Sequence, residues 1–214
     1  MKKQYIASIV VLLITLLFIS GCSNVGNRAT NNNPSTAEKI SYFACDWPHY
    51  DTVQSLCEAA TDIYEGKITD VFFKIIDMRS GKVVDDKSID DKTYLSLYTV
   101  YEIDVTNSYK RAESDKMYVC VGTGLEGYKE VEQCELMKSA GIYNESTGIQ
   151  VVRGFEPLQI GDSRLFLTVD LGGTYNYIIN ADQFAFDKDD VEKSGSFGYS
   201  EIKAFTTEQI KAIE

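Results

Sequence analysis

Residues 95–106 constrain the fold more than any other part of this chain. Apolar side chains alternate there with polar ones: Leu95, Leu97, Tyr101, Ile103 and Val105 share one face, and Ser96, Glu102, Asp104 and Thr106 share the other. A period of two residues is typical of a β-strand that packs on one side and meets water on the other. The sequence therefore predicts a sheet with one buried face.

Further segments carry strand patterns of the same kind. Residues 63–73 are rich in β-branched and aromatic side chains, with Gly66 expected at a bulge or bend. Shorter strands are expected at 117–121, 164–169, 175–179 and 183–186, the last two joined by a hairpin turn at 180–182. Short helices are expected at 51–60, capped by Asp51, and at 207–213, capped by Thr206. Many strands with few short helices predict a mainly β fold, a small barrel with flanking helices.

Two longer stretches are predicted to be loops. Residues 77–93 are polar around a Ser-Gly pair and suit a projecting hairpin, while residues 122–163 suit a long excursion. The glycines at 122, 124 and 127 resemble a nucleotide-binding loop only superficially, because no helix pattern follows them. We interpret this run as a flexible turn.

The N-terminus has the pattern of a lipoprotein signal. Lys2 and Lys3 precede a short apolar stretch that ends in Gly21 and Cys22. We expect residues 1–21 to be a signal peptide that is removed, and Cys22 to receive fatty-acyl chains that hold the chain at the extracytoplasmic face of a bacterial cell membrane. The alternative is an uncleaved transmembrane anchor, and both place residues 23–214 outside the cytoplasm. Residues 22–40 are then the lipidated cysteine with a flexible tether, and residues 41–214 the β-barrel domain.

The charge of the chain argues against nucleic acid as a partner. Of the 21 basic residues, Lys2 and Lys3 leave with the signal, so 19 remain against 32 acidic residues, a formal net charge of −13. A field of this sign repels phosphate backbones and anionic lipid. The acyl chains, and not electrostatic attraction, would therefore hold the protein at the membrane.

Four cysteines follow Cys22, namely Cys45, Cys57, Cys120 and Cys134. An even number outside the cytoplasm favours two disulfides over a zinc site, because structural zinc sites usually use closely spaced cysteine pairs. Three pairings are possible, and the sequence does not choose among them. The acidic run at 187–192 lacks the spacing and glycine of an EF-hand, so we expect neither a metal nor another cofactor.

Three segments together resemble the tissue inhibitors of metalloproteinases and the wider netrin-like module. The first match comprises Cys45, Pro48, His49, Cys57, Asp62 and the strand at 63–68. The second is residues 97–110, similar to a strand that runs from a tyrosine pair to Tyr-Lys, and the third is Leu158 and Gly161 followed by 165–167. They cover about half of residues 45–170, and the resemblance implies an OB-like, netrin-like barrel of five or six strands.

The resemblance also implies roles for individual residues. In those inhibitors the first cysteine is the mature N-terminus, and its amine and carbonyl bind the zinc of the target protease. By position, Cys45 would chelate and Asp46 would enter the specificity pocket, but here Cys45 lies inside the chain and its nitrogen is an amide. Chelation would need a second cleavage before Cys45. The family topology implies the pairs Cys45–Cys134 and Cys57–Cys120.

The best candidate for partner recognition is the segment Cys45, Asp46, Trp47, Pro48, His49 and Tyr50. Trp and Tyr are enriched where partners dock, although Trp47 could equally pack back on the barrel. His49 is the only histidine, which removes most hydrolase mechanisms, so we expect no catalytic residues and no enzyme. The sequence predicts a lipid-anchored binding module with a protein partner, either a metalloprotease or an envelope protein. The alternative is a structural envelope lipoprotein without inhibitory activity.

Overall fold

The computed structural model describes residues 38–84, 91–188 and 198–211, which belong to one unit beginning at Glu38. They form mainly β-strands with three short α-helices. In chain order the elements are β1 (Ile40–Phe43), α2 (Val53–Ala59), β2 (Asp62–Asp77), β3 (Lys82–Val83), β4 (Leu95–Lys110), β5 (Lys116–Val121), α3 (Glu130–Ala140), β6 (Ile149–Val152), β7 (Ser163–Val169), β8 (Asn176–Ile178), β9 (Ala185–Phe186) and α4 (Tyr199–Lys211).

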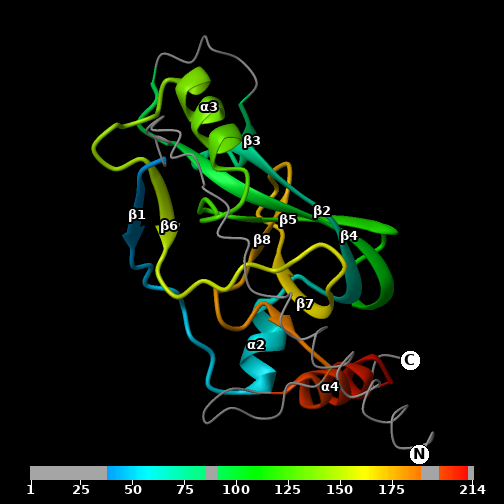
Figure 1. Cartoon of the computed structure of the whole chain (residues 1–214). Helices are drawn as coiled ribbons and strands as arrows, with labels where there is room; N and C mark the ends of the chain where they lie inside the picture. The colour runs from blue at the N-terminus through cyan, green and yellow to red at the C-terminus, as the bar shows by residue number, and fades with distance from the viewer. Residues whose placement is uncertain (1–37, 85–90, 189–197, 212–214) are drawn as a thin grey trace, which may run out of the picture. The chain divides into compact units, whose positions relative to one another are not determined.

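Five of the strands close into a barrel (Figure 1). β2 pairs antiparallel with β4 and β4 with β5, β5 pairs parallel with β8, β8 pairs antiparallel with β7, and β7 returns to β2. Closure removes the free edges of a sheet. This mixed five-stranded barrel is OB-like, and the predicted fold class is confirmed.

The two longest strands, β2 and β4, bend around the barrel through bulges. Their register shifts at three places, one of them between Glu65 and Gly66, so the predicted bulge at Gly66 is confirmed. A Cβ atom at Gly66 would lie 2.5 Å from Ile103 Cγ2 and 2.9 Å from the Asp104 carbonyl oxygen. Glycine therefore allows the two strands to approach closely at the bend.

The alternation in β4 holds, but its outer face is less polar than expected. Leu95, Leu97, Tyr101 and Ile103 are buried in the main core, as predicted. On the opposite face, a second cluster is buried around Ile76, Tyr98, Val100 and Cys120, with Phe72, Tyr118, Tyr175 and Tyr177 packed against it. Only the second half of the outer face, which carries Asp104 and Thr106, is open to water.

The helices differ in detail from the sequence predictions. Thr52, and not Asp51, caps α2, because its hydroxyl accepts a hydrogen bond from Ser55 N at 3.0 Å. α4 begins eight residues before the predicted helix, so Thr206 lies inside it and donates to the Ile202 carbonyl at 2.9 Å. Helices α2 and α4 lie side by side (Figure 1).

β1 and β6 form a separate two-stranded parallel sheet that begins within the expected tether. Ile40 pairs with Ile149, and Ile149 N donates to the Lys39 carbonyl at 2.8 Å. Ile40 packs against the core. This contact fixes the chain from β1 onward, although residues 22–40 have the composition of a linker. The expected signal peptide and Cys22 lie outside the described residues.

Candidate functional site

Residues 45–50, called here the docking segment, connect β1 to α2. Cys45, Asp46, Pro48 and His49 are exposed, whereas Trp47 and Tyr50 are partly buried against the main core. Of the two roles considered for Trp47, the structure therefore supports packing on the barrel. The indole and the phenol ring fasten the segment, and the side chains between them face outward.

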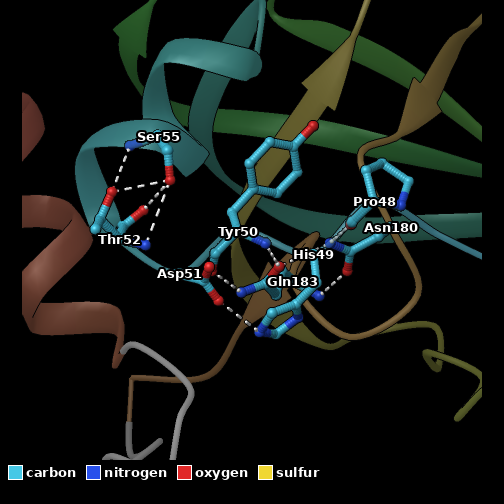
Figure 2. A network of polar contacts seen from close by, with 8 residues as sticks. All are labelled: Pro48, His49, Tyr50, Asp51, Thr52, Ser55, Asn180 and Gln183. Carbon is cyan, nitrogen blue, oxygen red and sulfur yellow. Dashed lines mark hydrogen bonds and ion pairs between the residues drawn. The ribbon is translucent and has the colours of Figure 1, made fainter.

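Two buried amide side chains from the turn between β8 and β9 hold the backbone of the docking segment (Figure 2). Gln183 is 1% exposed, and its amide pairs with Tyr50 in both directions, accepting from Tyr50 N at 3.1 Å and donating to the Tyr50 carbonyl at 3.0 Å. Asn180 is 3% exposed and donates to the Pro48 carbonyl at 2.9 Å. Side-chain amides thus pair with backbone groups that lie outside any strand at this point.

The same two residues stabilise their own turn. Asn180 Oδ1 accepts from Asp182 N at 2.9 Å and from Gln183 N at 2.6 Å, and Asn180 Nδ2 donates to Gln183 Oε1 at 2.8 Å. This is the side-chain turn typical of asparagine. The chain turns at 180–182 as predicted, but the expected hairpin is not formed, because β8 and β9 each pair with β7 and not with each other. The turn presents Gln183 to the docking segment in one orientation.

The C-terminal side of the docking segment passes directly into the cap of α2. Thr52 and Ser55 form a reciprocal capping box, which fixes the entry into the helix. His49 Nε2 lies 4.0 Å from an oxygen of Asp51, and both side chains are largely exposed. Such a surface pair contributes little to stability, so His49 is available to a partner.

The predicted disulfides are not formed, and all four thiols are free. Cys45 is exposed in the docking segment, whereas Cys134 lies on the buried face of α3. Cys57 packs in the main core, and Cys120 belongs to the second cluster on the outer face of the barrel. Because the side chains point into different clusters, the pairing taken from the family topology does not apply to this chain.

Burial gives the three inner thiols a structural character. It raises the pKa of Cys57 to about 11, that of Cys120 to about 12 and that of Cys134 to about 11. A thiol with so high a pKa stays protonated near neutral pH and is a poor nucleophile and metal ligand. These three cysteines therefore act as small core residues.

Sequence reasoning selected residues 45–50 as a candidate but missed the residues that hold them. Asn180 was expected in a turn, and Gln183 at the start of a strand, without a role for either. An Asn with a Gln three positions later, between two short strands, is the only local signal. It does not reveal a contact to residues more than 130 positions earlier in the chain.

In the part of the chain that the structure describes, no helix is long and apolar enough to cross a membrane, and no three His, Cys, Asp or Glu side chains gather as metal ligands would. No protein-family model and no curated protein matches this chain.

Proposed function

We propose that this chain is a non-enzymatic binding module, held at the outer face of a bacterial membrane by a lipid on Cys22, and that the docking segment recognises a protein partner. The observation that carries the proposal is the way in which Asn180 and Gln183 hold an exposed segment in one conformation. A segment that is already ordered loses less conformational entropy when a partner binds. Exposed side chains on a rigid backbone are therefore well suited to specific recognition.

Inhibition of a metalloprotease is the narrower form of this proposal. The resemblance places Cys45 at the chelating position and Asp46 at the pocket position. Ala44 and Cys45 are both exposed, so a protease could reach the bond between them. Cleavage there would create a free amine on Cys45, which is a far better zinc ligand than an amide nitrogen. It would also release the domain from the membrane.

The lipid anchor is tested by the mass of the mature N-terminal peptide. We expect this peptide to begin at Cys22 and to carry a diacylglyceryl group, because the apolar stretch ends at a small-residue cleavage site before that cysteine. Mass spectrometry of the protein from membranes provides the measurement. A peptide that contains residues 1–21 and an unmodified Cys22 would contradict the anchor.

Recognition by the docking segment is tested by placing a benzophenone side chain at position 49 of the full chain on living cells. We expect irradiation to give a discrete crosslinked species, because His49 is exposed on a segment whose backbone is fixed. The crosslinked mass is measured by gel and by mass spectrometry. Gln183→Leu, which removes both hydrogen bonds to Tyr50, should reduce the yield several-fold.

The control for this experiment is the same photoreactive group at Thr106. This residue is exposed on the open outer face of β4, outside the docking segment. If positions 49 and 106 give the same products, the contacts are nonspecific and the proposal is wrong. It is equally wrong if position 49 gives no product while the chain is folded and at the cell surface.

A further inference from the structure

A hollow of about 480 Å³ lies beside β1, between β6 and the loop that follows β5. Its lining includes the buried side chains of Leu125, Val152 and Phe155. Tyr42 from β1 and Glu126 from the loop also line it, and both are exposed. The volume falls within the range of about 300–1,000 Å³ that is usual for sites that bind small groups.

The polar side of this hollow is negatively charged. The Tyr42 hydroxyl donates a 2.5 Å hydrogen bond to Glu126 Oε2, and this bond raises the pKa of Tyr42, together with the charges of Glu126 and Glu130. Tyr42 is 49% exposed, so its ring is open to a ligand. Among the described residues, none of those that line the hollow is a lysine, arginine or histidine that would neutralise Glu126.

Aliphatic and aromatic walls with one carboxylate suit a particular kind of ligand. A lysine or arginine side chain needs an apolar surface for its methylene stem and an anion for its head. The carboxylate supplies a charge-assisted hydrogen bond, and an aromatic face attracts a cation that lies close to it. An anionic ligand would meet repulsion from Glu126 and from a chain whose formal net charge is −11 before any processing.

We propose that this hollow binds a lysine or arginine side chain of a protein partner. β1 ends at Phe43, so the hollow adjoins the docking segment along the chain. On the core side, Phe155 stacks on Phe184 with ring centroids 6.1 Å apart, and Phe184 follows the Gln183 that holds Tyr50. The choice of a protein as the source of the basic side chain rests on the proposed function, whereas the affinity of the hollow for such a side chain does not.

The test uses the full chain and two acetylated, amidated tripeptides, Gly-Lys-Gly and Gly-norleucine-Gly. The peptides have side chains of similar length, and only the first is charged. Dissociation constants are measured at low salt from NMR shifts of the protein amides. We expect the lysine peptide to bind about 5-fold more tightly than the norleucine peptide, as for a partly exposed ion pair, and added salt to remove the difference.

Two variants locate the interaction. Glu126→Gln removes the charge but keeps an acceptor for the Tyr42 hydroxyl, and it should bring the lysine peptide to the affinity of the norleucine peptide. Glu113→Gln makes the same change in net charge at an exposed position after β4, and it should leave both affinities unchanged. Equal binding of the two peptides, or equal effects of the two variants, would overturn the proposal.

The result is separable from that of the crosslinking experiment. If the lysine peptide binds as expected but position 49 captures nothing, the hollow is a cation site and the docking segment is not a recognition surface. If position 49 captures a partner and the peptides bind alike, the docking segment stands and the hollow is not a site for a basic side chain.

Discussion

Replacing Gln133 by leucine is expected to lower the free energy of unfolding by about 4 kcal/mol. Gln133 is fully buried in α3, and its amide makes three hydrogen bonds to the backbone of the preceding loop. It accepts from Leu125 N at 3.0 Å and donates to the carbonyls of Leu125 at 2.8 Å and Tyr128 at 2.6 Å. Leucine has a similar size but leaves all three backbone groups without this partner, and an unpaired buried polar group costs about 1–3 kcal/mol.

This loss is measured by urea unfolding of the full chain. The fluorescence of Trp47 reports the unfolding, because it is the only tryptophan and packs against the core. The control is Gln150→Leu, a change of the same type at an exposed position of β6, which should alter stability by no more than about 0.5 kcal/mol. Equal losses in the two variants would mean that the amide of Gln133 is not important for holding the loop.

The barrel was predictable because strand alternation is a local property. In residues 95–106 the polarity of most side chains indicates which face they occupy, and Gly66 marks the bend in the strand that pairs with them. The same reasoning could not foresee the second aromatic cluster. Tyr98 was left off both faces of the predicted strand, and its partner Tyr177 comes from β8, with ring centroids 6.0 Å apart.

The stretch at 122–163 was misjudged because its signals are weak or depend on distant residues. It contains α3, which begins at a left-handed Lys129 without a side-chain cap, so the usual sequence mark of a helix start is missing. The glycine run was interpreted as a flexible turn. A Cβ atom at Gly124 would lie only 2.3 Å from Ile149 Cγ2 and 2.5 Å from Gln133 Oε1, so glycine serves close packing there.

The cysteines show where a count of residues misleads. Four thiols in a chain expected outside the cytoplasm favour disulfides by compartment, but a bond also requires two side chains that face each other. Cys57 lies in the main core and Cys120 in the second cluster, so their side chains do not face each other. The sequence around each cysteine does not show which cluster it joins. The clamp on the docking segment is also non-local, because Gln183 and Tyr50 are 133 positions apart.

Replacing Glu65 by alanine is expected to cost about 2 kcal/mol at pH 7, because the buried hydroxyls of Tyr109 and Tyr199 lose their acceptor at about 1 kcal/mol each. The ion pair with Lys203 adds little, since the Lys203 side chain is 44% exposed. The Glu65 carboxylate, on β2, accepts hydrogen bonds from Tyr109 at 2.8 Å, from Lys203 at 3.0 Å and from Tyr199. Lys203 and Tyr199 belong to α4, so this carboxylate fastens the last helix to the barrel. Without it, the ammonium group and two hydroxyls lose their common acceptor.

The dependence on pH identifies the charge of Glu65 as the cause. Burial alone would raise its pKa, but the bonds from Tyr199, Lys203 and Tyr109 outweigh burial and hold the pKa below its ordinary value of 4.5. A lowered pKa in the folded state means that the stabilisation is complete well above pH 4.5 and is lost as the pH falls through the folded pKa. Urea unfolding at a series of pH values should therefore show the difference between wild type and Glu65→Ala shrinking toward acid pH. Glu156→Ala, at an exposed position, should show a small difference at every pH, and a Glu65 difference that stays constant into acid would mean that packing, and not the carboxylate, holds α4.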